Sequence, residues 1–70
     1  MSWGTRLRWL RVIRGLSQWD LSVKMGASQS TISLFEQGKR QPTDREKEQI
    51  ERVLKWTPET EAALEALEVA

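Results

Sequence analysis

The chain has 70 residues, no cysteine, no histidine and a net charge of only +1. Seventy residues allow one small domain, near the lower size limit for independent stability, and we expect residues 1–70 to form it. A disulfide framework and a Cys/His metal site are excluded by composition, and no cofactor is indicated. Arginines interrupt every apolar run near the N-terminus, so neither a signal peptide nor a membrane span is predicted and a cytoplasmic location is the default expectation.

The charge is distributed unevenly along the chain. Residues 1–42 carry seven basic and two acidic side chains, a balance of +5, whereas residues 43–70 carry four basic and eight acidic side chains, a balance of −4. A basic N-terminal part and an acidic C-terminal part would orient the domain toward a polyanion. An enzyme is not predicted, because the chain has no His or Cys, no Gly-rich phosphate loop and no clustered carboxylates on an apolar background.

The first predicted helix covers about residues 3–14 and ends before Gly15. Trp3, Leu7 and Leu10 share one face, which is expected to enter the core. Trp9 and Ile13, four residues apart, lie on another face. This helix is therefore apolar on more than one side.

The second predicted helix covers about residues 18–25. Ser17 can cap its N-terminus, and Asp20 three residues later completes a capping-box pattern. Leu21 and Met25 supply its apolar face. The helix is followed by Gly26, which can adopt the positive φ that closes a helix C-terminus.

The third predicted helix covers about residues 29–37, begins after the capping residue Ser28 and ends before Gly38. Ile32 and Phe35, three residues apart, form its apolar pair. Two short helices joined by such a tight turn are typical of a helix-turn-helix, in which the second helix enters the DNA major groove.

The opposite face of that third helix is polar but uncharged. It carries Gln29, Ser30, Ser33, Leu34 and Gln37. Uncharged donors and acceptors suit base edges, and a glutamine can pair with adenine through two hydrogen bonds. A face of this composition that merely contacts solvent is the alternative.

Two further helices are predicted after the basic loop 38–42, in which Pro42 prevents simple helix continuation. The first covers about residues 44–54 and is capped by Thr43. The second covers about residues 58–68 and begins with Thr57 as cap. No strand pattern is present, so the sequence predicts five helices in one all-α domain.

The last helix is expected to bury Ala63, Leu64 and Leu67, with its glutamates outside. Leu64 and Leu67 could instead supply a dimer contact. Completion of the core of a single copy is the favoured interpretation, because apolar residues are few elsewhere.

Three dense motifs support a more specific interpretation: R-L-R-x-L-R-x-x-R-G-L-S-Q, K-x-G-x-S-Q-S-x-I-S and E-x-G-K-R-x-P. Over about residues 3–58 the chain resembles the Cro/CI (XRE-type) helix-turn-helix repressor family. The resemblance implies a compact five-helix bundle of the lambda-repressor-like type. It also implies binding to double-stranded operator DNA, usually as a homodimer on a palindromic site.

The resemblance implies roles for two sets of residues. The base-contacting set is Gln29, Ser30, Ser33 and Leu34, and the phosphate-contacting set is Gln18, Ser28, Gln37, Lys39, Arg40, Thr43 and Arg45. Gln18 is expected to brace Gln29, which would read adenine. Leu34 departs from the usual polar residue, and contact with a thymine methyl or partial burial in the core are both open. Arg11 and Glu36 correspond to a buried ion pair in the family.

The clearest departures from the family are apolar residues where Glu, Lys or Arg is usual: Trp9, Val12, Ile13, Trp19 and Val23. Trp19 could pack on the DNA backbone or contact a protein. An alternative function is therefore a protein-interaction module, antitoxin-like or corepressor-like, with a partner bound through Trp9, Ile13, Trp19 and Val23. Scattered surface apolar residues are the simpler reading. The lack of Cys, His and Tyr and the regular segment TPETEAALEALEVA would also suit an engineered member, although small natural regulators share these traits.

Overall fold

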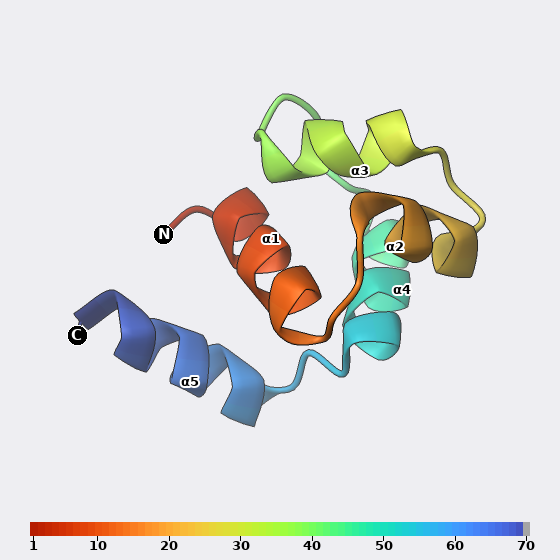
Figure 1. The fold of residues 1–70 in the computed structure, drawn as a ribbon. Coiled ribbons are helices and arrows are strands. Elements are labelled where there is room, and N and C mark those ends of the chain that lie inside the picture. The colour runs from red at the N-terminus through yellow and green to blue at the C-terminus, as the bar shows by residue number, and fades with distance from the viewer. Residues whose placement is uncertain (70) are drawn as a thin grey trace.

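A computed structural model of the protein describes residues 1–69. These residues contain no strand and form five helices (Figure 1), namely α1 (Trp3–Ile13), α2 (Gln18–Met25), α3 (Gln29–Glu36), α4 (Asp44–Leu54) and α5 (Pro58–Val69). The prediction of an all-α, five-helix fold is confirmed. Helices α1 and α3 each end one residue earlier than expected, since Arg14 and Gln37 are their C-caps, and α5 extends one residue further.

Capping boxes begin α2 and α4. In α2, Asp20 N–H donates to Ser17 Oγ at 3.0 Å, and Ser17 N–H donates to Asp20 Oδ2 at 2.9 Å. Thr43 and Glu46 make the same exchange at the start of α4. The hydrogen bond from the capping residue's backbone N–H lowers the pKa of Asp20 and of Glu46, because it favours the ionised carboxylate.

The turn between α2 and α3 is made by Gly26, whose φ of 67° lies in the left-handed region. A side chain there would strain the backbone, so glycine suits the position. Ser28 then caps α3 by accepting a hydrogen bond from the Thr31 N–H. Helices α2 and α3 pack closely against each other. They form the helix-turn-helix that the sequence predicts.

Apolar side chains from all five helices, together with Trp56 from the loop after α4, form one core. Its buried members are Leu7, Leu10, Leu21, Ile32, Phe35, Ile50, Leu54, Trp56 and Leu64. The pairing of two tryptophans was not predicted: the Trp56 ring stacks on Trp3 with centroids 5.7 Å apart and an interplanar angle of 12°. This stack joins the start of α1 to the segment between α4 and α5.

The contact between α1 and the end of α3 is very close. A Cβ atom placed on Gly4 would lie 2.5 Å from the Phe35 carbonyl oxygen and 2.6 Å from that of Glu36. Because these neighbours are backbone atoms, they cannot move aside as a flexible side chain would. Gly4 therefore allows α1 to approach the C-terminal end of α3.

Helix α5 buries less than the sequence predicts. Leu64 is 2% exposed, but Leu67 is 48% exposed and Ala63 is also exposed, so the expectation that all three enter the core is wrong. In Figure 1, α5 lies beside α1, on the side away from α3. A helix that docks at one edge of a small bundle buries only a narrow stripe.

Candidate nucleic-acid interface

A shallow hollow lies in front of α3, beside the start of α2. It is lined by Gln18, Gln29, Ser30, Ser33 and Leu34. The four predicted base-contacting residues thus share one surface, and Gln18, which is expected to brace Gln29, comes from the neighbouring helix. The lining contains no ionised side chain, so its hydrogen-bonding groups are uncharged.

The polar side chains on this face are partly ordered by hydrogen bonds between α3 and its two capping residues. Gln37 Nε2 donates to Ser33 Oγ at 2.8 Å, and the hydroxyls of Ser28 and Ser30 lie 3.2 Å apart. Leu34 is 36% exposed, so much of its side chain is open to the hollow. The rest of its surface is covered by the fold, so Leu34 is partly buried and also faces the hollow.

The amide of Gln18 has a different partner from the one predicted. Gln18 Nε2 donates to Glu36 Oε1 at 3.1 Å, and residues 1–69 contain no hydrogen bond between Gln18 and Gln29. In the protein without DNA, the Gln18 amide is thus bound to Glu36. The physical reason is that a carboxylate is a stronger acceptor than a neutral amide.

Glu36 also binds Arg11, in the ion pair implied by the family resemblance. Arg11 Nε lies 2.6 Å from Glu36 Oε2 and Nη2 lies 3.2 Å from Oε1. Arg11 Nη1 donates to the Leu16 carbonyl oxygen at 2.8 Å, just before α2 begins. Arg11 therefore joins three elements: α1, the start of α2 and the end of α3.

The residues predicted to contact phosphate fall into two groups. The hydroxyls of Ser28 and Thr43 already accept backbone hydrogen bonds as helix caps. Lys39 and Arg45 are exposed. The Arg40 guanidinium lies over the Phe35 ring, 5.6 Å from its centroid, and this contact holds a half-exposed cation beside the end of α3.

A comparison with protein families decides what this arrangement is. A family model described as a helix-turn-helix domain matches residues 3–67. The chain belongs to this family. Helix-turn-helix domains are DNA-binding modules of regulators and are typically not enzymes. Comparisons with curated proteins and with solved structures gave no match.

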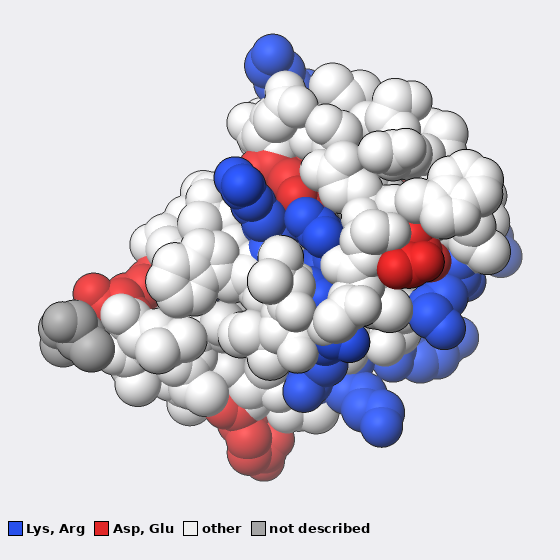
Figure 2. Space-filling view, viewed as in Figure 1, with Lys and Arg blue, Asp and Glu red and all other residues white. Residues whose placement is uncertain are grey.

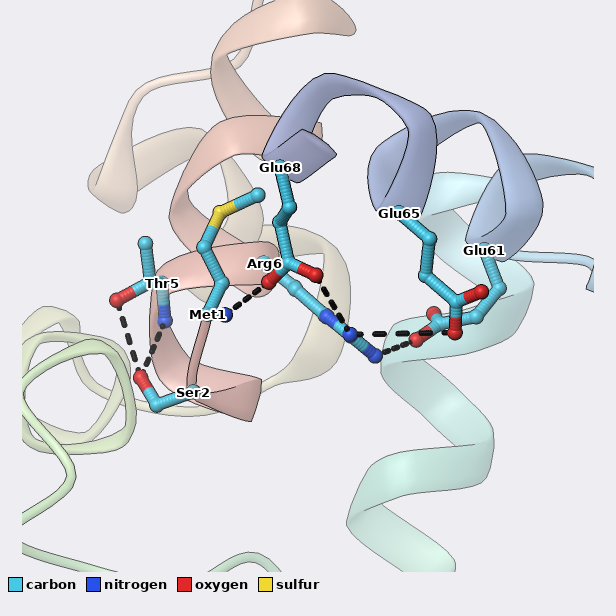
Figure 3. A network of polar contacts seen from close by, with 7 residues as sticks. All are labelled: Met1, Ser2, Thr5, Arg6, Glu61, Glu65 and Glu68. Atoms are coloured by element: carbon cyan, nitrogen blue, oxygen red, sulfur yellow. Dashed lines mark hydrogen bonds and ion pairs between the residues drawn. The ribbon is translucent and has the colours of Figure 1, made fainter. Parts of the chain in front are cut away.

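Several arginines of this helix-turn-helix domain bind other groups of the same domain. Arg6 faces Glu61, Glu65 and Glu68 of α5 (Figure 3), with Nη2 3.3 Å from a Glu68 oxygen. Arg14 Nε donates to the Leu54 carbonyl oxygen at 2.8 Å and so caps the end of α4. The surface over α3 is mostly uncharged in Figure 2, with basic atoms at its edge. The basic excess of residues 1–42 therefore overstates the charge available to DNA.

Several large apolar side chains of the helix-turn-helix domain are exposed, as the sequence indicates. On α1, Trp9 is 42% exposed and shares a hollow with Val12 and Ile13. On α2, Trp19 and Val23 are each about 60% exposed. The hollow beside Trp9 is lined by residues of α1 and includes neither Trp19 nor Val23. No helix in the same range is long and apolar enough to cross a membrane.

Proposed function

We propose that the protein is a transcriptional regulator, repressor-like, that binds double-stranded DNA sequence-specifically with α3 in the major groove. The observation that carries the proposal is the uncharged hollow formed by Gln18 with Gln29, Ser30, Ser33 and Leu34. In the complex, Gln29 pairs with an adenine through its amide, and the serines reach neighbouring acceptors. Leu34 packs against a thymine methyl group.

The backbone contacts come from the rim of this hollow. Lys39 and Arg40 follow α3 directly and bind phosphates on one side. Gln18, Ser28, Gln37, Thr43 and Arg45 add weaker polar contacts. Contacts of this kind set register and affinity but carry little sequence information. Because few cations surround the hollow, we expect a modest dependence of affinity on salt.

The test is a selection of bound duplexes from a randomised pool, followed by fluorescence anisotropy on the enriched site. We expect one motif, on which Gln29→Ala weakens binding by about 1–3 kcal/mol and relaxes one base position. Gln49→Ala on α4 is the matched amide control and should leave the affinity unchanged. If no motif is enriched, or if Gln29→Ala binds like the wild type, base readout by α3 is wrong.

The selected motif also decides the assembly. A palindrome whose half-sites lie about one helical turn apart would indicate a homodimer on DNA, and a lone half-site would indicate a monomer. Lys39→Ala should weaken binding to all sequences alike and lower the salt slope by about one. This uniform loss distinguishes a phosphate contact from a base contact.

A second function is favoured by the exposed apolar residues Trp9, Ile13, Trp19 and Val23, which suit contact with a protein partner. Their exposed fractions lie between 42% and 62%. Replacement of both tryptophans by glutamate should abolish partner capture and leave DNA affinity within a few-fold of the wild type. Unchanged capture and self-association in this variant would eliminate the second function.

A further inference from the structure

The carboxylate of Glu36 has two partners, and one of them belongs to the proposed DNA-binding face. Oε1 of Glu36 accepts from Arg11 Nη2 at 3.2 Å and from Gln18 Nε2 at 3.1 Å. The side chain of Glu36 is only 4% exposed, whereas Gln18 is half-buried and lines the hollow in front of α3. A buried carboxylate is thus linked directly to an interface side chain.

An ionised carboxylate only accepts hydrogen bonds, so it distinguishes the two ends of a glutamine amide. The NH₂ end of Gln18 must face Glu36. If the amide turned over, two acceptor oxygens would face each other and the hydrogen bond would be lost. The carbonyl oxygen and the second N–H of Gln18 are consequently left for the hollow.

The carboxylate itself is fixed from the other side. Arg11 Nε lies 2.6 Å from Glu36 Oε2, and Arg11 Nη1 is bound to the Leu16 carbonyl oxygen at 2.8 Å. The guanidinium is planar and holds the carboxylate in one plane through two bonds. The orientation of Gln18 is therefore set by a rigid group behind the interface.

We propose that Glu36 is a positioning residue for base readout, because it fixes the direction of the Gln18 amide and, through it, that of Gln29 on DNA. With its carbonyl oxygen toward the hollow, Gln18 accepts one N–H of Gln29. Gln29 then presents its other N–H to adenine N7 and its oxygen to adenine N6–H. The inference rests on the proposed function and places a determinant of specificity outside the contact surface.

The experiment is a double-mutant cycle on the enriched duplex, with Gln18→Ala, Glu36→Gln and the double variant. A glutamine at position 36 can donate as well as accept, so it no longer fixes the Gln18 amide. We expect Glu36→Gln to lose about tenfold in affinity when Gln18 is present and almost nothing in the Gln18→Ala background. The loss should be largest for adenine at the position that Gln29 reads.

Two further variants separate positioning from charge and from folding. Glu48→Gln on α4 removes the same charge at an exposed site, and we expect it to bind DNA at least as well as the wild type. Glu36→Asp keeps the charge opposite Arg11 but withdraws the carboxylate by one methylene. If Glu36→Gln does not fold, Glu36→Asp takes its place in the cycle, and we expect a smaller loss with the same dependence on Gln18.

The free protein supplies a readout that does not involve DNA. The side-chain amide hydrogen of Gln18 that is bound to Glu36 should have a chemical shift distinct from that of a solvent-exposed glutamine. In Glu36→Gln, both Gln18 amide shifts should move toward those of a solvent-exposed glutamine. An equal loss of affinity in both Gln18 backgrounds, or a loss that is the same for every base, would overturn the positioning role while leaving α3 readout intact. If the wild type selects no motif, the proposed function fails and the positioning role fails with it, whatever the Gln18 signals show.

Discussion

Two arginines of α1 bind glutamates of other helices, and their surroundings differ. Arg11 meets Glu36 of α3 through two bonds, with side chains 11% and 4% exposed. Arg6 meets a row of glutamates on α5, where the Arg6 side chain is 21% exposed and those of Glu68, Glu61 and Glu65 are 22%, 31% and 60% exposed. The first pair is enclosed between helices, and the second contacts solvent (Figure 3).

The difference indicates that the α1–α3 contact and the α1–α5 contact are stabilised in different ways. A buried charge destabilises the fold unless it is paired. Loss of one partner is therefore costly, because the other charge stays buried and unpaired. Charges at the surface are screened by water and salt, and their pairing contributes little. We therefore expect α1–α3 to be fixed by its ion pair and α1–α5 to be held mainly by Leu64 and the tryptophan stack.

The largest effect is expected from Arg11→Met, which breaks the enclosed pair. Glu36 would remain buried without its cation, and the free energy of unfolding should fall by about 3–5 kcal/mol. A domain of this length has only about 4–10 kcal/mol in total. Urea denaturation followed by circular dichroism measures the loss. A loss below about 1 kcal/mol would show that the pair is not the main link between α1 and α3.

Leu64→Ala tests the other end of the molecule and should have the next largest effect. Leu64 is 2% exposed, and removal of a buried leucine side chain costs about 2–5 kcal/mol. Leu67→Ala is the matched control on the same helix, and its 48% exposure predicts a change of about 0.5 kcal/mol or less. Equal losses for the two variants in urea denaturation would contradict the narrow docking stripe of α5.

Arg6→Met should destabilise the protein less than either of these changes. The pairs that it removes are only partly exposed, so the loss should be largest at low ionic strength and should shrink in 1 M salt. The measurement is the difference in Tm between variant and wild type as salt is raised. A difference in Tm that persists in high salt would mean that Arg6 stabilises the protein through packing. It would contradict the proposed difference between Arg6 and Arg11.

The smallest effect concerns pH. The pKa values of Asp20 and Glu46 are lowered by backbone hydrogen bonds of the capping boxes. A carboxyl group with a lowered folded-state pKa contributes stability above its ordinary pKa, near 4, and this contribution is lost as pH falls further. Urea unfolding from pH 6 to pH 3 should show a decline that is shallower in Asp20→Asn and Glu46→Gln. If the free energy of unfolding falls with pH equally steeply in both variants and in the wild type, the capping boxes do not contribute to the acid sensitivity.

The same comparison explains what could be predicted from the sequence. Caps, turns and apolar faces depend on residues three or four positions apart, so Ser17 with Asp20 and Ile32 with Phe35 were identified correctly. The uncharged face of α3 followed from helical periodicity in the same way.

The features that were missed join residues far apart in the chain. Trp3 stacks on Trp56, and Arg6 pairs with the glutamates of α5. Gln18 binds Glu36 and not Gln29. A local sequence pattern does not predict which partner a long polar side chain will bind. In the same way, a charge count along the chain does not show that Arg6, Arg11 and Arg14 bind other groups of the same domain.

The most direct test of the central claim is an NMR titration of the ¹⁵N-labelled protein with the selected duplex. The account predicts that the side-chain amide signals of Gln18 and Gln29 shift, together with backbone signals of α3 and of Lys39. The Trp9 indole signal and the signals of α5 should stay in place. Shifts centred on Trp9 and α5, with those of α3 unchanged, would contradict DNA recognition through the hollow.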